Sequence, residues 1–168
     1  MDNNKICSKI IEASNIASLE NISDFVRTYI EKLVYNISMY VEPEFSLGSI
    51  EILSDFSGRC ELSQAITGIP SAYSCIDGKT DALVTFAEHY SHLGITSFDM
   101  LAREAILDFL NLHNGLFLVN LSETENVEST LTPPTSDDNG EPLESYPDTY
   151  IMPVEFKFGT VNFVLSEK

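Results

Sequence analysis

Apolar residues recur at helical spacing in the first long segment of the chain, from Ser18 to Glu42. They stand three or four residues apart, as in an amphipathic helix; they are Ile22, Phe25, Val26, Tyr29, Leu33, Ile37 and Tyr40. Ser18 is a candidate N-cap, and Pro43 would end this helix. A second, shorter helix is predicted over residues 80–94, with Thr80 as its candidate cap and Gly94 as its stop.

The longest helical pattern runs from Ser97 to Leu121. At about 100° per residue, four of its positions fall within a sector of about 60°; they are Glu104, Asp108, Asn111 and Gly115, which we call the polar strip. Apolar residues occupy the opposite side, namely Ala102, Ile106, Phe109, Leu116 and Phe117. We therefore expect a helix that buries one face and presents the polar strip on the other.

Several other segments alternate between apolar and polar residues, which is typical of strands. Residues 45–70 alternate weakly and predict two or three strands, with a turn at Ser57-Gly58. Residues 72–76 predict a further strand. Residues 127–135 predict a short strand that stops at the Pro133-Pro134 pair.

The C-terminal residues 149–168 alternate most clearly. Gly159-Thr160 fits the two-residue turn of a hairpin within this segment. Pro153 favours an edge position or a strand start, because proline donates no backbone hydrogen bond. The preceding residues 136–148 are rich in turn formers and carboxylates and predict an acidic loop.

Short turns join the predicted strands, so the sheet should be largely antiparallel. The two long helices need an apolar surface to pack against, and the sheet supplies it. The pattern therefore predicts an α+β fold of layers, with two long helices packed on a largely antiparallel sheet. A length of 168 residues suits one domain spanning 1–168, in which residues 1–17 form either a short helix or a flexible extension.

The net charge of −17 narrows the classes of partner. An acidic surface repels nucleic-acid phosphates and anionic membranes, so we expect neither as a partner. No apolar run reaches the ~18 residues of a membrane span, and the N-terminal residues do not resemble a secretory signal. The three cysteines, Cys7, Cys60 and Cys75, are odd in number and lack C-x-x-C spacing. We expect reduced thiols and a cytoplasmic protein.

The polar strip offers limited chemistry. An asparagine amide both donates and accepts hydrogen bonds, so Asn111 could orient a water molecule. Asp108, one turn earlier, could pair with a lysine or accept a proton. Gly115 would let another surface approach closely. Such groups could hydrolyse an acyl phosphate largely by positioning, although a polar strip is also typical of a merely solvated helix face.

The histidines suggest no stronger site. His89 and His92 stand three apart and could share a metal ion, but no third ligand is evident, and a surface pair is the simpler interpretation. His113 falls on the apolar side of the long helix, which indicates a hydrogen-bonded core histidine.

The segment "LDFLNLHNG", followed later by "TPP", resembles the signature of the CheC/CheX/FliY chemotaxis phosphatases. That signature is an acidic residue, two positions, an asparagine, about twenty-two positions and a proline. Here Asp108 and Asn111 stand three apart, and twenty-two residues separate Asn111 from Pro134. The resemblance covers residues 97–166 and is strongest to CheX-like domains, whose C-terminal strands also look like "IMPVEFKFGTVNFVLS".

The resemblance implies a phosphatase acting on the phospho-aspartate of a response-regulator receiver domain. Asp108 would pair with the receiver's lysine and Asn111 would orient the attacking water. Glu104 would assist docking, and Pro134 would shape the loop beside the helix. The receiver would bring its own Mg²⁺, so this chain would need no cofactor of its own. The family position filled by Asp108 is normally glutamate, which is one methylene longer.

The resemblance leaves two further interpretations open. A non-catalytic CheX-like module for interaction or dimerisation would keep the fold without hydrolysis, and aspartate in place of glutamate favours it. A flagellar-switch domain like FliY is disfavoured, because the first long helix lacks a second copy of the motif. CheX-like proteins pair through sheet edges, which implies a homodimer. Either receiver-docking function requires Asp108 and Asn111 to face solvent, and we expect both to be unpaired.

Overall fold

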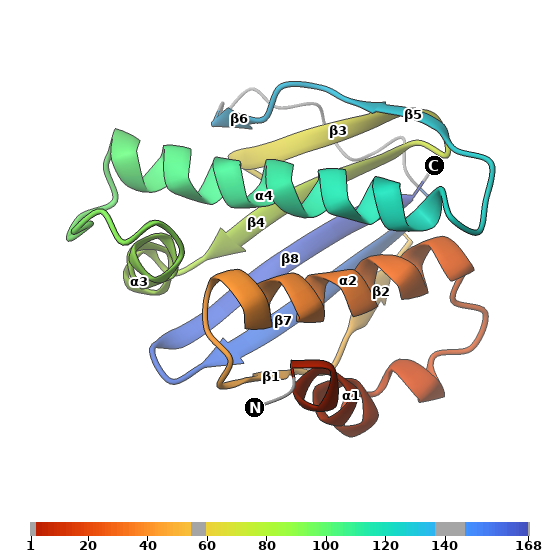
Figure 1. The fold of residues 1–168 in the computed structure, drawn as a ribbon, viewed down its shortest axis with the longest axis horizontal. Coiled ribbons are helices and arrows are strands. Elements are labelled where there is room, and N and C mark those ends of the chain that lie inside the picture. Colours follow the sequence, from red (N-terminus) through yellow and green to blue (C-terminus); the bar gives the residue numbers. More distant parts are fainter. Residues whose placement is uncertain (1–2, 55–59, 137–146, 168) are drawn as a thin grey trace.

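The computed structural model describes residues 3–54, 60–136 and 147–167 (Figure 1). The expected turn at Ser57-Gly58 and most of the expected acidic loop lie outside these ranges. The helices are α1 (Asn3–Ala13), η1 (Ile16–Ser18), α2 (Asp24–Tyr40), α3 (Thr80–Ser91) and α4 (Met100–Leu121). The strands are β1 (Phe45–Leu47), β2 (Glu51–Leu53), β3 (Leu62–Ile69), β4 (Ala72–Gly78), β5 (Glu128–Leu131), β6 (Thr135–Ser136), β7 (Asp148–Phe156) and β8 (Gly159–Glu167).

The strands form one antiparallel sheet in the order β1-β7-β8-β4-β3-β5. The short strand β2 pairs with β7 beside β1, and β6 pairs with β3 beside β5. Helices α2 and α4 lie next to each other across one face of this sheet, with α3 at one end and α1 beside α2 (Figure 1). The predicted α+β layered architecture is confirmed.

Side chains that cap α2 and α4 set where these helices begin. Ser23 Oγ accepts a hydrogen bond from Val26 N at 3.2 Å, so α2 begins at Asp24. The expected cap Ser18 is wrong, because its hydroxyl donates to Asn15 O at 2.7 Å and closes the short turn η1. Such a cap satisfies a backbone N–H that has no partner within the helix.

In α4, Asp99 Oδ1 accepts from Ala102 N at 3.1 Å, so the helix begins at Met100 rather than at Ser97. In α3, Thr80 is the first helical residue rather than the cap, which is Lys79. These shifts of a few residues leave the polar strip unchanged, because its four positions lie well inside α4.

The β7–β8 hairpin turns at Lys157 and Phe158, two residues before the expected Gly159-Thr160. Phe156 pairs with Gly159 across the turn, and the Phe158 ring stacks on Phe156 at 4.6 Å between centroids. Gly159 adopts a φ of 135°, and a Cβ there would lie 3.0 Å from Ala82 Cβ. The glycine is therefore needed at the start of β8, not inside the turn.

Pro153 lies inside β7, not at an edge or at a strand start as expected. It pairs with Asn162 of β8. On the other side of β7, β1 pairs with residues 154–156 and β2 with residues 149–151. Pro153 falls between these two stretches, where a missing N–H leaves the paired residues intact.

The core lies between the helices and the sheet. Rings from α2 and α4 meet there edge to face: Phe25 contacts Phe117 at 5.0 Å, and Tyr29 contacts Phe117 at 5.2 Å between centroids. The central strands of the sheet present mostly apolar side chains to the helices. Gln64 and Ser74 are buried polar exceptions, directly opposite each other on β3 and β4. These two polar residues lie beneath α4 and form part of the site described below.

The expectation of three reduced thiols is wrong for two of them. Cys60 and Cys75 form a disulfide with a Cα–Cα distance of 5.7 Å. The β3–β4 register places Ser63 opposite Cys75, and this brings the residues just before β3 close to β4. Cys7 is free and buried. Within the ranges given above, no helix is long and apolar enough to cross a membrane.

Candidate functional site

The polar strip lies on the exposed side of α4. Glu104, Asp108 and Asn111 are exposed, and Gly115 is partly exposed. The opposite side is buried, with Ile106, Phe109, Leu110, His113, Asn114 and Phe117 among its residues. The helix therefore has the two faces that the sequence predicts, and a carboxylate and an amide lie one turn apart on the exposed face.

Asp108 is held by a residue from the neighbouring helix α3. The Tyr90 hydroxyl donates to Asp108 Oδ2 at 2.6 Å. The Tyr90 ring meets Phe109 edge to face, with 5.4 Å between centroids. Burial, and next the hydrogen bond and charge of Asp108, raise the pKa of Tyr90. The phenol therefore stays protonated at neutral pH and acts as a donor to the carboxylate.

Asn111 is held by a residue from the sheet. Gln64 Nε2 on β3 donates to Asn111 Oδ1 at 2.7 Å and to the Thr132 carbonyl oxygen at 2.8 Å. Thr132 follows β5 and is itself tied to β3, because its N–H donates to the Ala65 carbonyl at 3.0 Å. The expectation that Asp108 and Asn111 are unpaired is therefore wrong, although both face solvent as expected.

Buried polar groups fix the amide of Gln64 from the other side. Asn114 Nδ2 donates to Gln64 Oε1 at 2.8 Å and to Ser74 Oγ at 2.7 Å. The Ser74 hydroxyl donates to the backbone carbonyl of Gln64 at 3.3 Å. Gln64 thus accepts on Oε1 and donates on Nε2, so the amide orientation at Asn111 follows from a network that reaches into the core.

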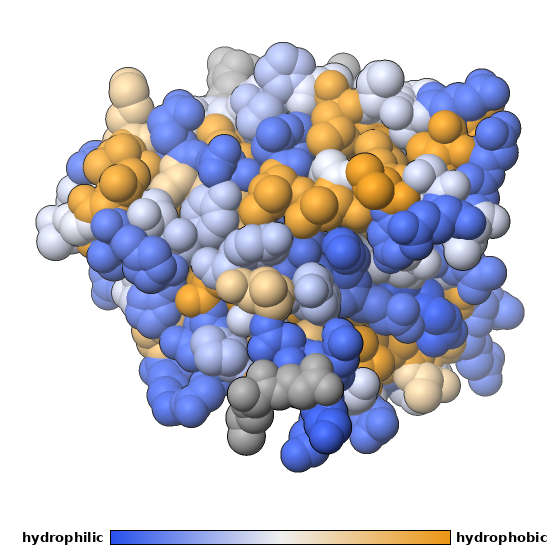
Figure 2. All heavy atoms as spheres, viewed as in Figure 1, coloured by the Kyte–Doolittle hydropathy of each residue, from blue (hydrophilic) through white to orange (hydrophobic). Residues whose placement is uncertain are grey.

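A hollow of about 580 Å³ lies beside Asp108, between α3 and α4. Two carboxylates line it, from Glu104 and Asp108, and the described residues contribute no basic side chain to its wall. Leu93 and Leu101 also line it and are 60% and 46% exposed. Figure 2 shows apolar side chains emerging among hydrophilic ones over this helical side of the molecule. A hollow of this kind suits a long cationic side chain, with carboxylates for its head and apolar contacts for its stem.

Gly115 lies beside the end of β5, and Pro134 lies in the connection between β5 and β6. A Cβ added to Gly115 would lie 3.9 Å from Leu131 Cδ1, which is ordinary contact. The fold itself therefore does not require glycine at this position. Pro134 lies two residues after Thr132, in the same loop. Gln64 connects this loop to Asn111, because its Nε2 donates to both Thr132 O and Asn111 Oδ1.

His113 is a core residue, as expected. It is fully buried, and Asn36 Nδ2 lies 3.0 Å from its Nδ1. Burial, and next the positive charge of Lys32, lower the pKa of His113 to about 3. The ring is therefore neutral at physiological pH and takes no direct part in a surface reaction.

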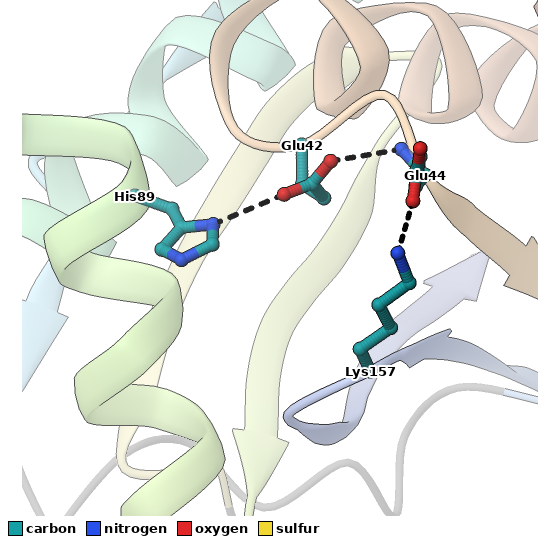
Figure 3. Close-up of polar contacts among 4 residues, drawn as sticks. All are labelled: Glu42, Glu44, His89 and Lys157. Atoms are coloured by element: carbon teal, nitrogen blue, oxygen red, sulfur yellow. Dashed lines mark hydrogen bonds and ion pairs between the residues drawn. The ribbon is translucent and has the colours of Figure 1, made fainter.

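A second polar cluster joins the ends of α2, α3 and the β7–β8 hairpin (Figure 3). His89 Nδ1 lies 3.4 Å from Glu42 Oε2, and Lys157 forms an ion pair with Glu44. His92 adopts a left-handed conformation after α3, which removes the helical relation between the two histidines. Within the described ranges, no group of three histidine, cysteine, aspartate or glutamate side chains could hold a metal ion. We interpret this cluster as a connection between elements.

Sequence reasoning missed Gln64 and Tyr90, the two residues that hold the polar strip. Neither residue is distinguished by its neighbours in the sequence, and their role depends on which elements become neighbours in the fold. One signal was present: Asn114 stands four residues after Leu110 and three before Phe117, and a polar side chain buried beside them requires partners. Those partners are Gln64 and Ser74.

Comparison with solved structures defines the class of fold. A CheC-like superfamily protein from Shewanella sp. PV-4 matches with a TM-score of 0.69 and 14% identity, over 88% of this chain and 99% of that one. CheX from Vibrio vulnificus matches with a TM-score of 0.69 and 13% identity, over 87% and 100% of the two chains. The fold is that of the CheC-like and CheX chemotaxis proteins.

A third structure includes a partner protein. CheX from Borrelia burgdorferi, solved as a complex of CheX, CheY, BeF₃ and Mg²⁺, matches with a TM-score of 0.62 and 14% identity, over 86% and 98% of the chains. The present chain has the fold of these CheX-like proteins, which confirms the predicted resemblance at the level of fold. No family model matches this sequence, and no curated protein matches it significantly.

Proposed function

We propose that this chain is a phosphatase that hydrolyses the phospho-aspartate of a response-regulator receiver domain. One observation carries the proposal: a carboxylate and an amide, Asp108 and Asn111, face solvent one turn apart on a helix of a CheX-like fold. The CheX of similar fold that was solved with CheY supports a response-regulator partner for this chain.

The reaction needs little from the chain beyond positioning. Water attacks the phosphorus, the bond between phosphorus and the aspartyl oxygen breaks, and the products are the free carboxylate and inorganic phosphate. Asn111 orients the water, and Asp108 pairs with the receiver's lysine. Mg²⁺ belongs to the receiver and neutralises charge on the phosphoryl group.

The hydrogen bond from Gln64 is compatible with this role of Asn111. An amide oxygen has two acceptor positions, and Gln64 uses one of them. The second position on Oδ1 and the donors on Nδ2 can still meet a water molecule. Because Gln64 limits the rotation of the side chain, the water-binding groups keep one direction before the receiver arrives.

A second candidate function is a CheX-like module that binds a signalling protein without hydrolysis. The observation that favours it is the shorter carboxylate at position 108. A misplacement of about 1 Å can reduce a rate about 100-fold. In that case Asp108 and Asn111 would contribute to docking, and phosphate loss from the bound receiver would not accelerate.

The test is a dephosphorylation assay on receiver domains of the source organism, phosphorylated with acetyl phosphate and Mg²⁺. We expect the wild-type chain to accelerate phosphate loss from at least one receiver, and Asn111→Ala to reduce this rate at least about 100-fold. Asn120→Ala is the matched control, because Asn120 lies on the same helix away from the polar strip. A receiver that binds without faster phosphate loss would establish the module instead.

We also propose that the chain acts in the cytoplasm, where response regulators act. A further proposal is that it forms a homodimer through a sheet edge. The edges are formed by β1 and β2 on one side and by β5 and β6 on the other. An edge strand has unpaired backbone groups that can continue the sheet in a second copy. Light scattering should give about twice the chain mass; a monomer at assay concentration would refute the dimer.

A further inference from the structure

Tyr90 is anchored in the core and reaches the polar strip from outside α4. Its ring meets Phe109 edge to face, at 5.4 Å and 80° between planes, and Phe109 is fully buried. Its hydroxyl lies 2.6 Å from Asp108 Oδ2. The position of the hydroxyl is therefore set by core packing rather than by the mobile side chains of an exposed helix face.

An exposed aspartate without such a partner would rotate among staggered rotamers, and its carboxylate would point in several directions. The bond from Tyr90 selects one direction and occupies one oxygen. Oδ1 stays available, and among the described residues no basic side chain pairs with Asp108. The negative charge is thus oriented but not neutralised, at the wall of the hollow between α3 and α4.

We propose that Tyr90 is a positioning residue that aims the Asp108 carboxylate at the cationic side chain of the receiver. In doing so it compensates for the methylene that aspartate lacks relative to glutamate. This inference rests on the proposed function for its consequence in catalysis. Its structural part, the restriction of Asp108 by the Tyr90 hydroxyl, stands on the geometry of this chain alone.

The activity test compares Tyr90→Phe with wild type. The substitution removes one oxygen and keeps the ring against Phe109, so the melting temperature should stay close to that of wild type. We expect kcat/KM on the phosphorylated receiver to fall about 10-fold, the scale of one hydrogen bond to a charged group. Tyr35→Phe is the matched control, because Tyr35 lies on the side of α2 that faces Cys7 and Ile11 of α1. Its kcat/KM should equal that of wild type.

Rescue by a longer carboxylate separates positioning from a general structural role. In the Asp108→Glu background, removing the Tyr90 hydroxyl should reduce kcat/KM less than about 3-fold, because the added methylene no longer needs the same support. An equal loss in both backgrounds would overturn the proposal. So would a Tyr90→Phe variant with the rate of wild type, or with a faster one.

A measurement on the isolated chain keeps the two proposals distinct. Three-bond NMR couplings across χ1 of Asp108 should indicate one rotamer in wild type and averaging in Tyr90→Phe. Identical couplings in both proteins would overturn the positioning role, whatever the activity. If wild type dephosphorylates no receiver while the couplings change as expected, the proposed function fails and the restriction of Asp108 by Tyr90 holds.

Discussion

The two faces of α4 each present an asparagine, and the contrast between them separates function from folding. Asn111 is exposed, and its amide oxygen accepts one hydrogen bond, from Gln64. Asn114, three residues later, is fully buried and donates to both Gln64 and Ser74. The same type of residue thus forms part of a surface site on one face and of a buried network on the other.

The titratable groups differ in the same way. Glu104 and Asp108 on the outer face are exposed carboxylates. His113 on the inner face is neutral, because burial lowers its pKa to about 3. The exposed carboxylates therefore lie on the face that can meet a partner, and the predictions below alter one face at a time.

The largest effect on stability is expected from the inner face. Phe117→Ala removes a fully buried ring that packs against Phe25 and Tyr29. We expect the free energy of unfolding to fall by about 3–5 kcal/mol, measured by urea denaturation. Val119→Ala, at an exposed position two residues later, should change it by less than about 0.5 kcal/mol. Similar losses in both variants would contradict the assignment of the faces.

Acid should lower the free energy of unfolding through His113, which lies on the inner face. Its pKa is lowered from 6.5 to about 3, so between these values the unfolded chain binds a proton that the folded chain excludes. Stability from this residue is complete above pH 6.5 and is lost as the pH falls towards 3, by at most about 1.4 kcal/mol per pH unit. Urea denaturation between pH 7.5 and 5 should show a shallower dependence in His113→Gln. Equal slopes in both proteins would contradict the role of His113.

The smallest effect is expected from Gly115→Ala, which should raise the stability of the fold and lower the affinity for the receiver. A Cβ there meets Leu131 at an ordinary distance, so Gly115→Ala should stabilise the helix by about 0.5–1 kcal/mol. If the glycine admits a receiver, the same variant should bind the phosphorylated receiver more weakly, as measured by titration calorimetry. A variant that is more stable and binds equally well would remove Gly115 from the partner-binding surface.

Residue patterns predicted the architecture because it depends on periodic burial. The two long helices, the antiparallel strands and the position of the polar strip all follow from which residues must leave water. The ends of elements were less predictable, because competing local hydrogen bonds decide them. Ser18 closes a short turn while Ser23 caps α2, and both are equally plausible caps by residue type.

The support of the polar strip could not be predicted, because it depends on contacts between distant segments. Tyr90 and Gln64 reach Asp108 and Asn111 from 18 and 47 residues away along the chain. The Cys60–Cys75 disulfide likewise depends on the β3–β4 register. Composition alone favoured free thiols, since nothing in the spacing indicated which strands pair.

The most direct test of the account measures both activity and stability in two variants, Asn111→Ala and Asn114→Ala. Asn111→Ala should lose receiver dephosphorylation at least about 100-fold and keep its stability within about 1 kcal/mol, because Gln64 Nε2 still bonds to Thr132. Asn114→Ala should lose about 2 kcal/mol of stability, because it removes the donor that Gln64 Oε1 and Ser74 Oγ share in the core. It should retain more activity per folded molecule than Asn111→Ala. An Asn111→Ala variant with the wild-type rate would contradict the central claim that the outer face of α4 is the active surface.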